Sequence, residues 1–107
     1  MPTTETVEIG DDLIITKSTR QASGSGTWVL GRLNGHRFSA LVFPAHAEHR
    51  EWEIGDSRIS KLWIQRLEDA REVYSWDRGQ DMPAATELAQ DLVGFLCAGL
   101  ADHTYPD

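Results

Sequence analysis

Residues 27–43 read TWVLGRLNGHRFSALVF, and this stretch decides the fold. Asn34-Gly35 separates two runs that are rich in β-branched, aromatic and other apolar residues. Asn-Gly is the preferred two-residue turn of a β-hairpin because both positions tolerate a positive φ. The stretch therefore predicts two antiparallel strands, over 27–33 and 36–43, joined by a tight turn.

The turn also fixes which residues of the two strands lie opposite each other. The opposed pairs are Leu33 with His36, Gly31 with Phe38, Val29 with Ala40 and Thr27 with Val42. Cross-strand partners share a face of the sheet. One face is smooth and apolar and consists of Val29, Gly31, Leu33, Phe38, Ala40 and Val42. The other face is mixed and consists of Trp28, Leu30, Arg32, Arg37, Ser39 and Leu41.

Further strands are predicted on both sides of this hairpin. An N-terminal hairpin should form over 5–9 and 12–17, and a C-terminal one over 58–67 and 72–77 around a turn at 68–71. In 58–67, alternation places Leu62 and Ile64 on one face and Ile59, Trp63 and Leu67 on the other. In 72–77, alternation places Val73 on one face and Tyr74 and Trp76 on the other.

A helix is predicted over 82–101. Asp81 is a good N-cap residue and Pro83 suits the first helical turn. Helical spacing collects the large apolar residues of this segment in one arc, namely Leu88, Leu92, Phe95, Leu96 and Leu100. We expect this arc to pack on the face that carries Val29 and Phe38. The fold class is therefore α+β, an antiparallel β-meander of five or six strands with one C-terminal helix on one face.

The composition is that of one soluble globular domain over residues 1–107. The formal net charge of −7 weighs against binding to nucleic acid or to anionic lipid, because both need a positive surface. Cys97 is the sole cysteine, so no internal disulfide forms. The first five residues resemble no signal peptide, and we expect a cytoplasmic protein without a cofactor.

The sheet face away from the helix is the first candidate functional surface. It should carry Trp28, Leu30, Leu41, Trp63 and Trp76, and with them Tyr74. Such an apolar surface needs a cover or a partner. Three alternatives remain open: the long 44–57 loop folds over it with Trp52, a second copy of the chain packs on it, or it forms a groove for a small ligand or peptide.

The 44–57 loop offers a second candidate. His46, Glu48, His49 and Asp56 could ligate a metal if the segment makes a helical turn, although the pattern is not the His-Glu-x-x-His of zinc peptidases. A solvated loop is the favoured reading, and no metal site is favoured. Basic residues offer a third candidate: Arg58 and Arg78, with Asp77, lie at one end of the C-terminal hairpin. They could bind a carboxylate or phosphate, or the Asp/Arg pairs could pair with each other and fix the hairpin to the start of the helix.

Three strings of the sequence resemble a family of small uncharacterised bacterial and phage-associated proteins. They are Gly26-Thr27-Trp28 through Asn34-Gly35, then Arg58-Ile59-Ser60-Lys61-Leu62-Trp63-Ile64, then Trp76-Asp77-Arg78-Gly79. The resemblance covers roughly residues 26–80 and implies no activity.

These observations favour a non-enzymatic interaction domain that forms a homodimer through the face around Trp28 and Trp63. The alternative is a small metal-dependent hydrolase or an anionic-ligand-binding domain that uses the 44–58 loop.

Overall fold

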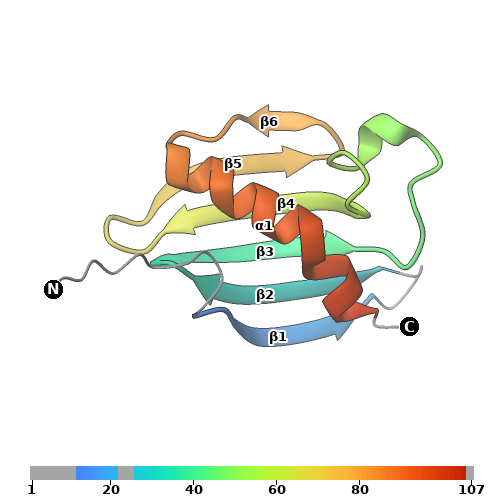
Figure 1. Cartoon of the computed structure of the whole chain (residues 1–107), viewed down its shortest axis with the longest axis horizontal. Coiled ribbons are helices and arrows are strands. Elements are labelled where there is room, and N and C mark those ends of the chain that lie inside the picture. The colour runs from blue at the N-terminus through green and yellow to red at the C-terminus, as the bar shows by residue number, and fades with distance from the viewer. Residues whose placement is uncertain (1–11, 22–25, 106–107) are drawn as a thin grey trace, which may run out of the picture.

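The computed structural model describes residues 12–21 and 26–105, which form one antiparallel sheet with a helix across it (Figure 1). Six strands lie side by side in sequence order. Their bounds are β1 Ile14–Arg20, β2 Thr27–Leu33, β3 His36–Val42, β4 Ile59–Arg66, β5 Arg71–Asp77 and β6 Gln80–Met82. A short 3-10 helix, η1, covers Arg50–Trp52, and the helix α1 covers Glu87–Thr104. The predicted α+β class and meander order are confirmed.

The Asn-Gly hairpin forms as predicted. Asn34 and Gly35 both have positive φ, 49° and 73°. Strands β2 and β3 pair without a bulge from Thr27 opposite Val42 to Leu33 opposite His36. The apolar face lies beneath the helix, where its residues are buried. A Cβ added to Gly31 would lie 2.9 Å from two ring carbons of Phe38, so the glycine makes room for that ring.

Two bulges change the faces predicted for the C-terminal strands. Between β3 and β4 the register shifts at Ser60, because Leu41 pairs with Lys61 while Val42 pairs with Ile59. Between β4 and β5 it shifts at Val73. A bulge adds one unpaired residue and resets the alternation. The prediction that Ile59 lies on the face opposite Leu62 and Ile64 was therefore wrong, since Ile59 is fully buried in the core. Val73 is buried in the core as predicted, but Tyr74 and Trp76, which were expected on the other face, point to the same side.

The predicted start of the helix was also wrong. Thr86, not Asp81, is the N-cap, and its hydroxyl oxygen accepts a hydrogen bond from the Ala89 N–H at 3.0 Å. Residues 80–82 instead form the edge strand β6. The carboxylate of Asp81 accepts a hydrogen bond from the Ser75 hydroxyl at 3.1 Å, which holds this strand against β5.

The buried face of α1 differs in part from the predicted arc. Leu92, Leu96 and Leu100 are buried as expected, but Leu88 and Phe95 are 39% and 36% exposed. Ala89, Val93 and Ala101 are buried in their place. The helix crosses the sheet diagonally, from β5 and β6 at its start toward β1 and β2 at its end (Figure 1). Small residues on this side allow the close approach.

The N-terminal hairpin falls partly outside the described residues. The strand predicted at 5–9 lies there, so its pairing stays a prediction. The strand predicted at 12–17 forms as β1, shifted to 14–20, and pairs antiparallel with β2. Among the described residues, no helix is long and apolar enough to cross a membrane.

Candidate functional site

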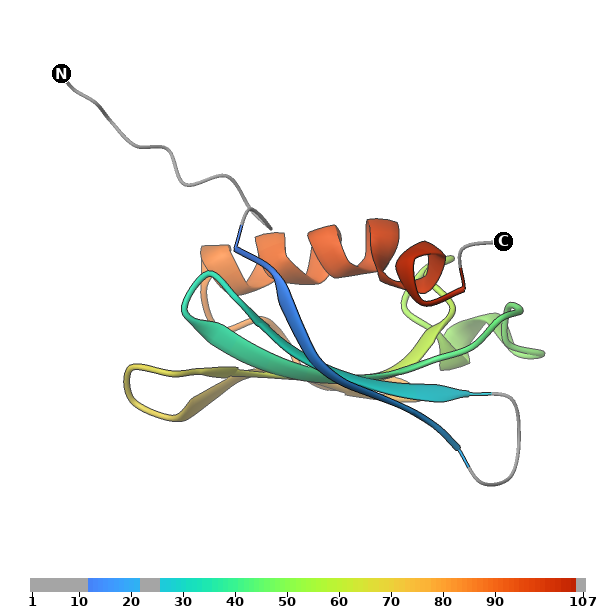
Figure 2. The ribbon, with the colours of Figure 1, turned by 90° about the horizontal axis from the view of Figure 1, so that it is seen from below.

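The face of the sheet opposite α1 is open (Figure 2). Its cross-strand pairs run in three rows. The first row is Ile14, Arg32, Arg37, Gln65 and Glu72; the second is Lys17, Leu30, Ser39, Trp63 and Ser75; the third is Thr19, Trp28, Leu41, Lys61 and Asp77. We call this surface the helix-free face.

The centre of the helix-free face is apolar. Leu30 is 37% exposed, and Trp28 and Trp63 are half-buried. The Arg37 guanidinium lies 5.5 Å from the centre of the Trp63 ring, within range of a cation–π contact, and its Nε donates to the Gln65 amide oxygen at 2.6 Å. Leu41 belongs to the face as predicted but is only 5% exposed.

Two aromatic residues predicted for this face lie on its other side. Trp76 pairs with Leu62 and Tyr74 with Ile64, and both partners face the helix. Trp76 packs against the core, and Tyr74 is buried. Burial raises the pKa of Tyr74 to about 12. The bulge at Val73 explains the placement, because it sets the alternation of all the residues that follow it in β5.

Charge divides the helix-free face into two halves. The half formed by β1 to β3 carries the cations Lys17, Arg32 and Arg37. The half formed by β5 and β6 carries Glu72 and Asp77, and Asp81 beside Ser75. Lys61 of β4 lies between the halves, 3.7 Å from Asp77. The face is thus polarised across the strands.

A shallow hollow lies between the two tryptophans. Its volume is about 150 Å³, and Trp28, Trp63, Ser39 and Ser75 are among its lining residues. The small serines leave the space that the indoles border. The hollow is open to solvent, so no other part of the described chain fills it.

The 44–57 loop does not cover Trp28 and Trp63. It lies beyond the end of the sheet where β3 ends and β4 begins (Figure 1). Trp52 is 37% exposed, and its carbonyl accepts a hydrogen bond from the Trp76 indole at 3.4 Å. The loop therefore leaves open the face that it was one candidate to cover.

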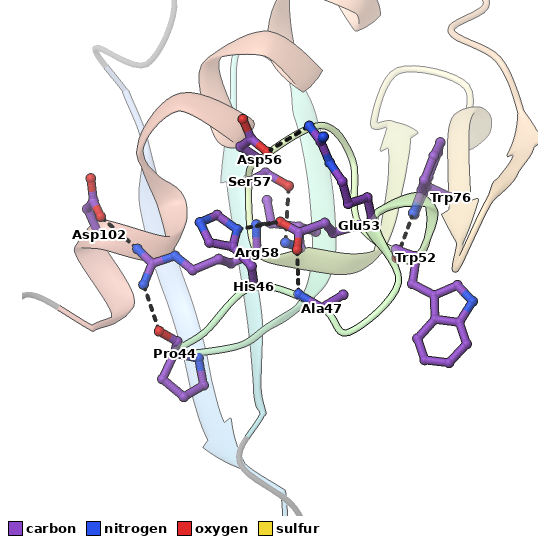
Figure 3. A network of polar contacts seen from close by, with 12 residues as sticks. Pro44, His46, Ala47, Trp52, Glu53, Asp56, Ser57, Arg58, Trp76 and Asp102 are labelled. Carbon is purple, nitrogen blue, oxygen red and sulfur yellow. Dashed lines mark hydrogen bonds and ion pairs between the residues drawn. The ribbon is translucent and has the colours of Figure 1, made fainter.

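Glu53 organises this loop (Figure 3). Its side chain is 3% exposed, and its carboxylate bonds to His46 Nδ1 at 3.0 Å, the Ala47 N–H and the Arg58 N–H at 2.7 Å. Burial alone would raise the pKa of Glu53, but these three bonds together lower it below its ordinary value. The carboxylate is thus a structural anion that closes the loop. Nothing in the sequence distinguishes Glu53 from the other two glutamates of the loop, Glu48 and Glu51.

The residues predicted as metal ligands diverge in the structure. His46 bonds to Glu53, whereas the His49 ring lies 4.2 Å from the Trp52 ring. Asp56 lies 3.8 Å from Arg50, and both side chains are more than four-fifths exposed. Within residues 12–21 and 26–105 no three histidine, cysteine or acidic side chains gather around one point. The structure does not bring His46, Glu48, His49 and Asp56 together.

The predicted anion-binding residues share one end of the sheet. The Arg58 guanidinium donates to the Pro44 carbonyl at 3.0 Å and to Asp102 of α1 at 2.7 Å (Figure 3). Asp77 pairs with Lys61. Arg58 therefore fixes β4 to the end of the helix rather than to its start, while Arg78 makes no side-chain hydrogen bond or ion pair within the described part of the chain.

A cleft of about 440 Å³ opens between the loop and the ends of the strands. Its residues come from the loop, from β3, from β4 and from the segments that flank β1, β2 and β5. They are Gln21, Leu41, Phe43, Ala45, His46, Ala47, Trp52, Glu53, Arg58, Ser60, Lys61 and Arg78. We call this space the sheet-end cleft.

Comparison with known proteins identifies a family and no activity. The sequence model that matches residues 27–101 is described as a domain of unknown function (DUF7678). No curated protein and no solved structure matches the chain. The matched range runs from the first residue of β2 to the last buried residue of α1, so the family is defined over the hairpin, the loop and the helix together.

Proposed function

The chain belongs to the DUF7678 family, and we propose that it is a non-enzymatic interaction domain that pairs with a second copy of itself through the helix-free face. The observation that carries the proposal is the combination on one open face of an apolar centre and two oppositely charged halves. Interfaces are enriched in tryptophan and arginine, and both occur here. A homodimer needs a surface that is complementary to itself.

The charge pattern selects one arrangement of the two copies. A two-fold axis parallel to the strands, between β3 and β4, places β2 of one copy over β5 of the other. Arg32 then lies over Glu72 of the partner, and Lys17 lies near the partner's Asp81. A two-fold axis that lies between the two sheets but runs perpendicular to the strands would place each strand over the same strand of the partner. The cations of one copy would then face the cations of the other. Like charges opposed in this way are unfavourable.

The same axis places Trp63 over Ser39 of the partner, because these two residues are cross-strand neighbours on the central strands. The indole would enter the hollow between the partner's tryptophans, which the small serine leaves free. Face-to-face sheets pack about 10 Å apart, a distance that interdigitating side chains fill. The proposed dimer thus buries the exposed apolar centre on both copies.

The size of the face limits the area that the proposed dimer can bury. Six strands about 4.8 Å apart, each about seven residues long at roughly 3.3 Å per residue, give a face of roughly 24 by 23 Å. Covering it on both copies buries on the order of 1,100 Å² in total, close to the lower limit of about 1,000 Å² for a specific interface. We therefore expect a weak dimer with a dissociation constant in the micromolar range.

Sedimentation equilibrium of the wild-type chain and of Trp63→Glu tests this proposal. The wild-type average mass should rise with concentration from the 12.0 kDa of one chain toward twice that value, and Trp63→Glu should remain monomeric. Leu88→Glu is the matched control, because Leu88 is 39% exposed on the helix, on the other side of the sheet. A wild-type monomer at every concentration, or equal losses in both variants, would contradict the proposal.

A further inference from the structure

The sheet-end cleft is the second surface of the molecule with the properties of a binding site. Its volume of about 440 Å³ falls within the range of roughly 300–1,000 Å³ that is typical of small-molecule sites. Its apolar lining residues include Leu41, Phe43 and Trp52, and we call these three the apolar wall. The cleft shares Leu41 and Lys61 with the helix-free face, so its binding is tested on the monomer.

Cations dominate the charge of the cleft, although the chain as a whole is acidic. Arg58, Lys61 and Arg78 line it, in a protein whose formal net charge is −7. Glu53 is the one acidic side chain among the described residues that line it, and three hydrogen bonds already occupy its carboxylate. Asp102 pairs with Arg58 and Asp77 pairs with Lys61, so Arg78 is the lining cation that remains for an anion.

Both arginines of the cleft have an unusual backbone conformation. Arg58 and Arg78 have φ of 64° and 55°, in the left-handed region that residues with a Cβ avoid. Such a conformation is unfavourable for a residue with a Cβ and persists where its surroundings fix it. The Arg58 N–H donates to Glu53, and the Arg78 N–H donates to the Ser60 carbonyl at 2.8 Å. Both side chains line the same cleft.

The other two cations differ from Arg58: Arg78 makes no side-chain hydrogen bond or ion pair within the described part of the chain, and Lys61 has one ion-pair partner, Asp77. The Arg58 side chain is 19% exposed and already bonds to Asp102 and Pro44. Lys61 is 33% exposed and only 3.7 Å from Asp77, and Arg78 lies beside it because its N–H bonds to the residue preceding Lys61. An anionic head group between Lys61 and Arg78 would have the apolar wall next to it.

We propose that the sheet-end cleft binds a small organic anion, with a carboxylate or phosphate head group held by Lys61 and Arg78 and an apolar body against Leu41, Phe43 and Trp52. The apolar wall supplies most of the buried area, and the cations select the anion. Neutral molecules of the same shape should bind less tightly, because they leave Arg78 without a partner and offer Lys61 no anion besides Asp77.

Displacement of a fluorescent aromatic sulfonate, 8-anilinonaphthalene-1-sulfonate, tests the proposal at protein concentrations where sedimentation shows a monomer. The sulfonate should bind at one site per chain. Decanoate and decyl phosphate should displace it, and decanol and inorganic phosphate should do so at least tenfold less well. The preferred one of the two decyl anions identifies the head group. Equal displacement by decanol, or more than one site per chain, would overturn the proposal.

Substitutions place the bound anion in the cleft. Arg78→Gln and Lys61→Gln should each weaken sulfonate binding roughly tenfold, which corresponds to about 1.4 kcal/mol. Arg71→Gln is the matched control, since Arg71 is an exposed arginine at the opposite end of β5. Lys61→Gln keeps the test decisive if Arg78→Gln does not fold. Binding that is weakened equally by Arg71→Gln, or unchanged by both cleft variants, would show that the anion binds elsewhere.

Discussion

Reversing one pair of charges tests the geometry of the proposed dimer. In that geometry Arg32 of each copy lies over Glu72 of the other, at the edge of the contact. An exposed ion pair contributes about 0.5 kcal/mol. Arg32→Glu turns the attraction into a repulsion of similar size, a change of about 1 kcal/mol per contact. Two-fold symmetry gives two contacts, so the total is about 2 kcal/mol, or roughly a 30-fold weaker dimer.

The assay is sedimentation equilibrium at low ionic strength, where surface charges are least screened. Glu72→Arg alone should weaken the dimer by a similar factor, and the double variant Arg32→Glu/Glu72→Arg should restore it to near the wild-type value. The double variant has the same net charge as the wild type, so recovery cannot come from net charge. Additive losses in the double variant would refute the pairing and, with it, the axis parallel to the strands.

Three further variants test the fold and the loop. Gly31→Ala should lower the free energy of unfolding by about 1–3 kcal/mol in denaturant titrations, because its Cβ would meet the Ile14 carbonyl at 2.6 Å as well as the Phe38 ring. Gly94→Ala, at a helical position with open space around it, should instead stabilise by about 0.5–1 kcal/mol, and equal effects would argue against the packing at Gly31. Glu53→Gln should lower stability at neutral pH by about 1–3 kcal/mol, because it replaces a charged acceptor of three bonds. The folded state lowers the pKa of Glu53, so the carboxylate stabilises the fold fully above its ordinary pKa of 4.5 and loses this contribution as the pH falls through the folded pKa. The free energies of unfolding of the wild type and of Glu53→Gln should therefore converge in acid. A stability difference that is independent of pH would contradict the role of the carboxylate.

The parts of the fold that depend on local chemistry could be predicted from the sequence. Asn34 and Gly35 fix a turn by their own φ preferences, and the turn fixes the register of β2 and β3 without reference to the rest of the chain. The small residue opposite Phe38 follows from that register. The order of the strands follows from short connections, because neighbours in sequence are usually neighbours in a sheet.

The parts that depend on distant contacts could not be predicted. Nothing local in Ser60 or Val73 marks a bulge, yet each bulge reverses the face of the residues beyond it. Asp81 and Thr86 are both good N-cap residues, and the choice between them follows from the pairing of β6 with β5. The burial of Glu53 likewise depends on groups that the loop brings to it. The charged residues at the sheet end could thus be predicted as candidates from their chemistry, whereas their contacts and roles could be assigned only from the structure.

One distance measures the central claim directly, that two copies meet through the helix-free face about an axis parallel to the strands. A nitroxide label at Ser18→Cys of β1, an exposed position on the helix side of the sheet, gives the separation of the two edge strands by pulsed electron paramagnetic resonance in a Cys97→Ala background. In the proposed dimer the two β1 strands are displaced by five strand spacings within the plane of the sheets and by one sheet-to-sheet spacing across the contact. Their backbones therefore lie roughly 26 Å apart. A distance near 15 Å would indicate strands stacked on their own copies, and the absence of any defined distance at dimer-forming concentrations would contradict the contact itself.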